Sequence, residues 1–231
     1  MQSTSGYDHA VAISSSMLTL NAVCSNSSST LEANHRVRVM GWVEWTATLL
    51  GIAYVLLMIR RNILCWVAGN ISVALQAVSF WEARLYADML LQGVYFAMGC
   101  YGWWLWWKQS PEAETKPIGS LRQRRTWSRL VLIWIGGSLV WAAMLRNWTN
   151  AAIPEVDAAL ASASLVATWM QAHRYLENWL LWIVIDSAYA LVYWTRGLHL
   201  YVVLYGIFVV LAWQGWKEWN RLLDEYVAAA G

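Results

Sequence analysis

Residues 60–107 read RRNILCWVAGNISVALQAVSFWEARLYADMLLQGVYFAMGCYGWWLWW, and the pattern returns 113 positions later, without a gap, at residues 173–220, which read HRYLENWLLWIVIDSAYALVYWTRGLHLYVVLYGIFVVLAWQGWKEWN. Eight matching pairs at this offset are Arg61 and Arg174, Trp66 and Trp179, Trp81 and Trp194, Leu85 and Leu198, Leu91 and Leu204, Gly102 and Gly215, Trp103 and Trp216, and Trp106 and Trp219. Five of these eight pairs are glycine or tryptophan, types that apolar composition alone seldom aligns. A duplicated block of apolar helices is typical of a transporter built from structural repeats.

Composition indicates a membrane protein. Of the residues, 59% are hydrophobic and 13% are charged, whereas a soluble domain has about 25% charged residues. Apolar runs of helix-spanning length predict seven helices. They cover Trp42–Ile59, Ile63–Trp81, Leu85–Trp107, Leu130–Leu145, Asp157–Ala172, Glu177–Tyr193 and Leu198–Trp219.

The repeat divides the chain into five parts. A first three-helix repeat covers residues 39–107, a basic loop with a linker helix 108–155, and a second three-helix repeat 156–220. Three helices per repeat and one linker helix put both repeats in the same orientation, which predicts a parallel 3-1-3 arrangement. Residues 1–38 are expected to be a disordered tail, with Met40 as a candidate start, and residues 221–231 a C-terminal tail.

The basic residues predict the orientation. Five of the 16 Lys and Arg lie on the side of the membrane that holds the N-terminus, and the other eleven lie on the side of the C-terminus. The positive-inside rule therefore places the N-terminus outside and the C-terminus in the cytoplasm of a multi-pass protein. The net charge of +2 does not indicate a nucleic-acid partner.

The helix at 177–193 carries the main candidate site. Trp179, Trp182, Asp186, Tyr189 and Tyr193 are spaced 3, 4, 3 and 4 and so share one helix face. Asp186 lies about 13–14 Å into the span, where a carboxylate costs about 3 kcal/mol or more and needs a partner. It either ties two helices together by a hydrogen bond or contacts a ligand or ion. The flanking aromatic side chains favour the second role, because aromatic faces attract a cation that a carboxylate neutralises.

A second candidate face lies on the helix at 85–107. Gln92, Tyr95, Gly99 and Gly102 share a stripe there, and Tyr205 is the repeat equivalent of Gln92. Such a pair suits a ligand held between the repeats, although membrane glutamines also form interhelical hydrogen bonds. The glycines are expected to permit close helix packing. Asn70 and Gln76 lie at mid-span on different faces, so at most one is expected to reach the site.

Other residues have simpler expected roles. The tryptophans at the helix ends are predicted to form an interfacial aromatic belt, and they are Trp103, Trp104, Trp106, Trp107, Trp216 and Trp219. The scattered Cys and His residues show no disulfide or metal spacing, so no metal or other cofactor is expected.

A membrane-embedded enzyme would need a second polar group converging on Asp186. A haem or quinone protein would need facing His residues. Transport, and not catalysis, is therefore predicted.

Three segments, in order within the repeat, resemble the PnuC family of bacterial vitamin transporters. Glu177-Asn178-Trp179-Leu180-Leu181-Trp182 with Asp186 is similar to the family's WxxWxxxN segment, and Leu85 to Asp88 through Gln92 with Tyr101-Gly102-Trp103 is similar to another signature. The last helix, from Gly197 through Tyr205 to Trp219, also fits, and the similarity covers about residues 40–220. It implies a SWEET-like 3-1-3 fold in the bacterial inner membrane.

The resemblance also implies a cargo, nicotinamide riboside or a related vitamin. Uptake would be by facilitated diffusion, with a cytoplasmic kinase trapping the cargo downstream. Where the riboside carriers have Asn, this chain has Asp186, which suits the aromatic cations nicotinamide riboside and thiamine alike; riboflavin, a neutral cargo proposed for other relatives, stays an alternative. Apart from Lys217, close to the end of the last span, no Lys or Arg lies inside a predicted span, which argues against a phosphorylated cargo. The expected substrate-binding residues are Trp179, Trp182, Asp186, Gln92, Tyr95, Tyr189, Tyr205 and Asn70. A homo-oligomer is also considered.

Overall fold

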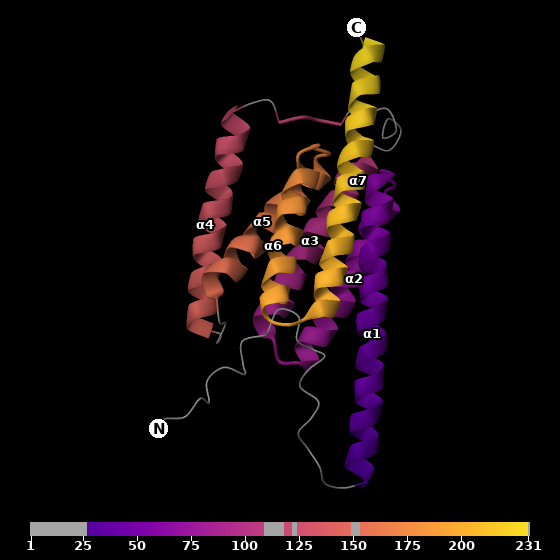
Figure 1. Cartoon of the computed structure of the whole chain (residues 1–231), viewed down its shortest axis with the longest axis vertical. Coiled ribbons are helices and arrows are strands. Elements are labelled where there is room, and N and C mark those ends of the chain that lie inside the picture. The colour runs from indigo at the N-terminus through magenta and orange to yellow at the C-terminus, as the bar shows by residue number, and fades with distance from the viewer. Residues whose placement is uncertain (1–26, 109–117, 122–123, 149–152, 231) are drawn as a thin grey trace.

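A computed structural model describes residues 27–108, 118–121, 124–148 and 153–230. These residues form seven α-helices (Figure 1). The helices are α1 (Ser27–Ile59), α2 (Leu64–Glu82), α3 (Tyr86–Lys108), α4 (Arg124–Trp148), α5 (Pro154–Ala172), α6 (Asn178–Thr195) and α7 (His199–Ala230). Each predicted span coincides with one of them, so the all-helical prediction is confirmed.

Two helices are longer than the sequence suggests. Helix α1 begins at Ser27, so residues 27–38 are helical and not part of a disordered tail. Residues 1–26 lie outside the described part of the chain. Helix α7 continues to Ala230, so most of the expected C-terminal tail is helical too. There Arg221 pairs with Glu218 and Glu225, three and four residues away, and such pairs support a helix beyond its apolar part.

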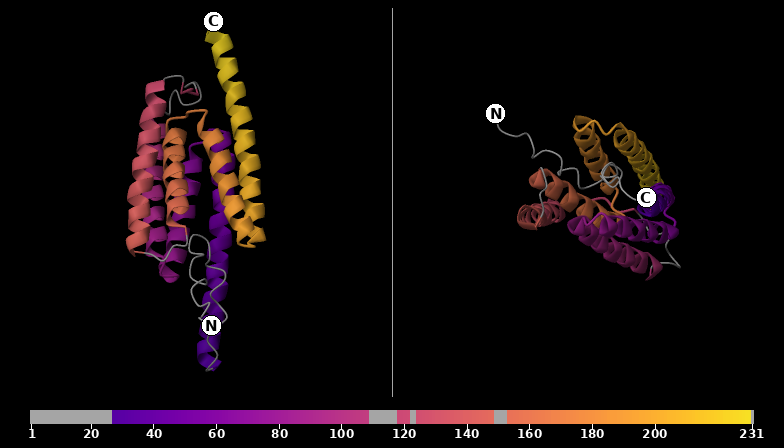
Figure 2. Two further views of the ribbon diagram at one scale, coloured as in Figure 1. Left: turned by 60° about the vertical axis from the view of Figure 1, so that its left-hand side comes forward. Right: turned by 90° about the horizontal axis from the view of Figure 1, so that it is seen from below.

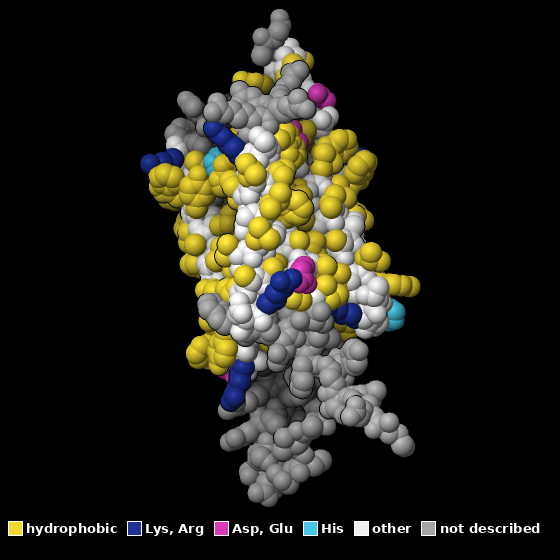
Figure 3. All heavy atoms as spheres, turned by 90° about the vertical axis from the view of Figure 1, so that its left-hand side faces the viewer, with side chains coloured by type: hydrophobic (Ala, Val, Ile, Leu, Met, Phe, Trp, Pro, Cys, Tyr) yellow, Lys and Arg dark blue, Asp and Glu magenta, His cyan; other side chains and the backbone are white. Residues whose placement is uncertain are grey.

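In the described part of the chain, four helices contain segments long and apolar enough to cross a membrane: Gly41–Ile59, Leu64–Glu82, Thr126–Asn147 and His199–Ala229. Helices α3, α5 and α6 are not among these four, and they carry many Trp, Tyr, Gly and small polar residues. Large apolar side chains cover much of the face shown in Figure 3, on the side of α4, and on α4 they include Leu132, Ile133, Leu139 and Val140. A surface of this kind is suited to lipid and not to water.

The helices pack in sequence order within two groups, α1–α3 and α5–α7. Helix α2 contacts α1 and α3, α6 contacts α5 and α7, and α4 packs against α5 (Figure 2). The two groups pack against each other where α3 contacts α5 and where α1 contacts α7. Each group thus presents its third helix to the first helix of the other.

The turns between helices repeat in detail. After α1, Asn62 N–H donates to the Leu57 carbonyl at 2.9 Å, and after α5, Tyr175 N–H donates to the Met170 carbonyl at 3.0 Å. These bonds close the helix ends in the manner of a Schellman motif, which needs a left-handed residue. Arg61 and Arg174 supply it with φ of 54° and 58°, and Arg84 and Gly197 do the same after α2 and α6 with 59° and 72°. All of these positions are related by the 113-residue offset.

Candidate functional site

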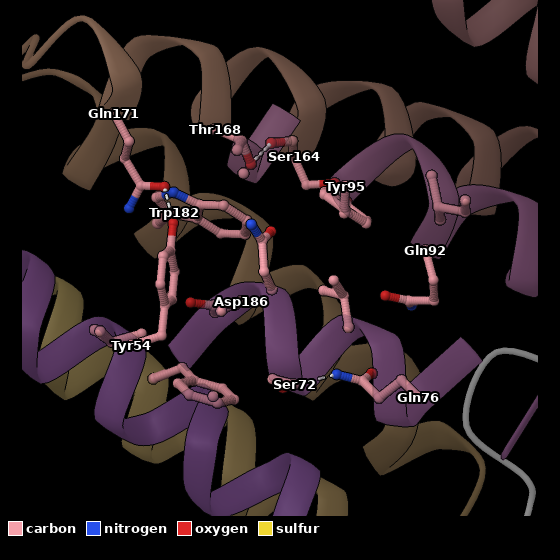
Figure 4. Close-up of a pocket in the computed structure, with 18 of the residues that line it drawn as sticks. Tyr54, Ser72, Gln76, Gln92, Tyr95, Ser164, Thr168, Gln171, Trp182 and Asp186 are labelled. Carbon is pink, nitrogen blue, oxygen red and sulfur yellow. Dashed lines mark hydrogen bonds between the residues drawn. The ribbon is translucent and has the colours of Figure 1, made fainter. Parts of the chain in front are cut away.

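A cavity of about 300 Å³ lies between the two groups of helices (Figure 4). Side chains from α1, α2, α3, α5, α6 and α7 line it. All eight residues expected at the site are among them: Trp179, Trp182, Asp186, Gln92, Tyr95, Tyr189, Tyr205 and Asn70. The fold therefore brings together residues that are up to 135 positions apart in sequence. Their role in binding substrate stays a prediction.

Asp186 is the carboxylate in the middle of the span of α6. Its side chain is 6% exposed and lines the cavity. Among the described residues, no hydrogen bond or ion pair holds its carboxylate. The structure thus lacks the interhelical hydrogen bond that a purely structural aspartate would make. A buried carboxylate without a protein partner is costly unless it is protonated or meets a cation.

Tyrosines form one wall of the cavity. The rings of Tyr189 and Tyr205 lie 5.1 Å apart and connect α6 to α7. Tyr193 stacks on Tyr205 at 5.3 Å, but it is buried behind the wall and does not line the cavity. Trp182, one turn before Asp186, adds a half-buried indole to the lining. Aromatic faces around a carboxylate provide an environment for a flat cation.

Six further uncharged polar or hydroxyl-bearing residues line the cavity but are not among the eight expected at the site: Tyr54, Ser72, Gln76, Ser164, Thr168 and Gln171. Tyr54 Oη–H donates to Gln171 Oε1 at 2.9 Å, and Tyr95 shares a hydrogen bond with Ser164. On α5 the spacing of 4 and 3 between Ser164, Thr168 and Gln171 puts all three on one face. That spacing was the available signal, but the helix is rich in Ala, Ser and Thr throughout, so the stripe does not stand out.

The expectation for α2 was wrong. Both Asn70 and Gln76 line the cavity, because the cavity extends around more of the helix than one face. Gln76 Nε2–H donates to Ser72 Oγ at 3.2 Å, and Ser72 Oγ–H donates to the Ala47 carbonyl at 2.7 Å. Asp88, in the first turn of α3, also lines the cavity and supplies a second carboxylate that was not expected there.

The glycines serve close packing, as expected. A Cβ on Gly102 would lie 2.5 Å from the ring of Trp66, and one on Gly215 would lie 2.6 Å from the ring of Trp179. Gly102 does not line the cavity, whereas Gly99 does.

The aromatic-belt prediction is wrong for two tryptophans. Trp106 and Trp219 are 1% and 0% exposed, because other helices cover them. Trp103, Trp104 and Trp107 are exposed, as a belt requires.

Comparison with known proteins places the chain among vitamin transporters. The model of the nicotinamide mononucleotide transporter family matches residues 41–221. The nicotinamide riboside transporter PnuC of Escherichia coli is 27% identical over 204 residues, covering 78% of this chain and 85% of that protein. The protein of the same name from Neisseria mucosa is 26% identical, covering 80% and 74%.

Two further matches bear on fold and cargo. The riboflavin/roseoflavin transporter RibM of Streptomyces davaonensis is 22% identical, covering 77% of this chain and 84% of that protein. The crystal structure of the vitamin B3 transporter PnuC superimposes with a TM-score of 0.63 at 26% identity, covering 80% of this chain and 83% of that one. Since the family model spans part or all of every helix, the chain belongs to the nicotinamide mononucleotide transporter family of membrane transporters.

Proposed function

We propose that this protein carries nicotinamide riboside, an unphosphorylated aromatic cation, across the membrane. The observation that carries the proposal is Asp186, a buried carboxylate with no hydrogen-bond or ion-pair partner among the described residues, in a cavity walled by aromatic rings. The nicotinamide ring is flat and positively charged, so the carboxylate supplies its counter-charge and the rings its faces. The names of the relatives from Escherichia coli and Neisseria mucosa support the same cargo.

The riboside fits the cavity better than the mononucleotide that gives the family its name. Phosphate recognition in proteins relies on Arg, Lys or helix N-termini, and the lining contains no Lys or Arg among the described residues. Two carboxylates, Asp88 and Asp186, line the cavity instead. They would repel a phosphate group.

Thiamine is the second candidate, because it also carries a cationic aromatic ring and Asp186 replaces the Asn of the riboside carriers. Riboflavin is a third, supported by the relative from Streptomyces davaonensis. Its neutral ring system would gain nothing from the carboxylate. Catalysis has no comparable support, because the family matched is one of transporters.

We further infer the membrane arrangement. The proposed fold is a 3-1-3 SWEET-like arrangement in which α1–α3 and α5–α7 are parallel repeats and α4 is the linker, as the repeated turns and reciprocal helix contacts suggest. The protein would lie in the bacterial inner membrane with its C-terminus in the cytoplasm. Uptake would be facilitated diffusion, with a kinase trapping the cargo afterwards. A C-terminal reporter active only in the cytoplasm tests the orientation.

Thermal stability of the purified protein tests the cargo. A ligand that binds only the folded state raises stability by about 2.7 kcal/mol at 100 times its Kd. We expect nicotinamide riboside to raise the melting temperature, with nicotinamide mononucleotide at equal concentration as the matched control that leaves it unchanged. A larger shift with thiamine or riboflavin would reassign the cargo. If nicotinamide mononucleotide shifted the melting temperature as much as the riboside, the claim that the two carboxylates disfavour a phosphate group would be wrong.

A further inference from the structure

Two hydrogen bonds cross between the repeats at the end of the bundle that carries the C-terminus. Trp106 Nε1–H donates to the carbonyl of Ala172 at 3.0 Å, and Trp219 Nε1–H donates to the carbonyl of Ile59 at 3.1 Å. Donors and acceptors are each related by the 113-residue offset. The two hydrogen bonds are therefore equivalent: one runs from α3 to α5 and the other from α7 to α1.

The acceptors are the last residues of α1 and α5. Carbonyls in the last turn of a helix have no partner within the helix and must find one elsewhere. Both donor side chains are almost fully buried, so water does not replace them readily. The two bonds thus hold the end of α1 to α7 and the end of α5 to α3.

These bonds lie one aromatic ring away from the cavity. Trp66 and Trp179 line the cavity. Trp66 meets the ring of Trp106 edge-on at 5.7 Å and 88°, and Trp179 meets Trp219 at 5.4 Å and 89°. Because interiors are close-packed and Trp66 and Trp179 lie directly against Gly102 and Gly215, a cargo that shifts either ring also displaces the indole behind it.

The two bonds have different surroundings. The guanidinium of Arg174 lies 4.4 Å from the ring centroid of Trp106. Burial lowers the pKa of Arg174 to about 10, which still leaves it charged at neutral pH. Gly119 joins both sides of this turn, donating to the Arg174 carbonyl at 3.0 Å and accepting from Leu176 N–H at 2.9 Å. In the described part of the chain, no cation–π contact or β-bridge of this kind covers the bond between Trp219 and Ile59.

We propose that Trp106 and Trp219 are the gate at this end of the cavity, and that the bond between Trp219 and Ile59 is the one that breaks first to let cargo pass. The inference rests on the proposed transport function, because it assigns to these tryptophans the closing of one exit. Cargo against Trp66 and Trp179 would act on the gate through the edge-on ring contacts. Arg174 and the segment 118–121 would keep the hydrogen bond between Trp106 and Ala172 intact for longer.

Cys65 provides a native reporter of opening. It is 0% exposed and belongs to the same buried cluster as both gate tryptophans. In a Cys24→Ser, Cys100→Ser background, it is the sole remaining cysteine. Its rate of reaction with a water-soluble maleimide, in purified protein in nanodiscs, then measures how often this end opens.

Replacing each gate tryptophan by Phe removes the donor and keeps an apolar ring. Trp219→Phe should raise the labelling rate about 5-fold or more, since a buried carbonyl loses its only indole donor in the closed state. Trp106→Phe should raise it less, because Arg174 and the segment 118–121 still hold that side. Trp107→Phe is the matched control and should leave the rate unchanged, because Trp107 is 65% exposed.

A destabilised variant separates gating from loss of fold. Leu130→Ala removes a buried side chain in a different cluster, on α4, and should lower the melting temperature without raising labelling. If Leu130→Ala raises labelling as much as Trp219→Phe, or if both Phe variants label like the wild type, the gate assignment is wrong. Labelling without cargo does not depend on which vitamin is carried. A failure of the proposed cargo would appear only in binding, and a failure of the gate only in labelling.

Discussion

Trp182 lies one helical turn before Asp186 on α6, and both side chains line the cavity. We expect Trp182→Ala to weaken binding of a cationic vitamin by about 1–2 kcal/mol, roughly 5- to 30-fold in Kd, because one aromatic wall around the cation is lost. A binding titration on purified protein measures this change. Trp107→Ala is the control, since Trp107 is exposed at the surface, whereas the buried Trp106 does not serve that purpose. Equal small effects from the two substitutions would remove Trp182 from the site.

Substitution of Asp186 can separate the effect of charge on ligand binding from the effect of shape. Asp186→Asn keeps the size and one acceptor but removes the negative charge, so it should weaken a cationic vitamin and leave a neutral analogue of similar shape almost unaffected. Thiamine uptake, if present, should fall more than nicotinamide riboside uptake, because the resembling riboside carriers have Asn here. Counterflow of both vitamins and the neutral analogue in liposomes measures the difference.

The same assay distinguishes the other roles open to Asp186. Loss of all three ligands to the same extent would indicate a structural role. Accumulation that follows an imposed pH gradient in the wild type, and is lost in Asp186→Asn, would make this carboxylate a proton carrier and exclude simple facilitated diffusion.

At the scale of the helices, glycines determine how closely α6 and α7 approach. Gly215→Ala would place a Cβ 2.6 Å from the ring of Trp179, which is itself packed against Trp219. Overpacking of this kind costs about 1–3 kcal/mol, so we expect the melting temperature to fall. Thermal unfolding followed by intrinsic tryptophan fluorescence measures the change.

Gly206 on the same helix is the matched control. A Cβ there meets nothing within 4 Å, so Gly206→Ala should leave stability unchanged or raise it by up to about 1 kcal/mol through helix propensity. A loss of stability for Gly206→Ala as large as that for Gly215→Ala would show that the contact with Trp179 does not matter.

At the scale of the whole molecule, transport of a cation without a counter-ion would depend on the membrane potential, because each cargo molecule carries one positive charge across. Moving one charge across 100 mV is worth about 2.3 kcal/mol, so liposomes with a negative interior at that potential should accumulate nicotinamide riboside about 50-fold at equilibrium. The carboxylate of Asp186 stays with the protein and does not cancel this charge. Radiolabelled uptake under a potassium diffusion potential, with and without valinomycin, measures it. Accumulation unaffected by the potential would contradict transport of the cation alone.

The residues alone were enough to predict the seven helices and the face of α6 that lines the cavity, and they show the 113-residue repeat. Span length and side-chain periodicity are local properties, so they follow from the residues alone. The eight expected site residues all line one cavity, to which helices from both ends of the chain contribute. The start of α1 at Ser27 was missed because Ser and Asn are weak helix formers, and here the apolar part of the helix extends into them.

Which tryptophans at the helix ends are exposed and which are covered by another helix could not be predicted without the folded structure. Trp106 and Trp107 are neighbours in sequence, yet one is buried and the other is 65% exposed. Likewise Asn70 and Gln76 both reach the cavity, and the polar face of α5 completes it. Burial of this kind depends on side chains from the other repeat, far away in the chain. The partner of Trp219 is the carbonyl of Ile59, 160 residues earlier, and no local pattern carries that information.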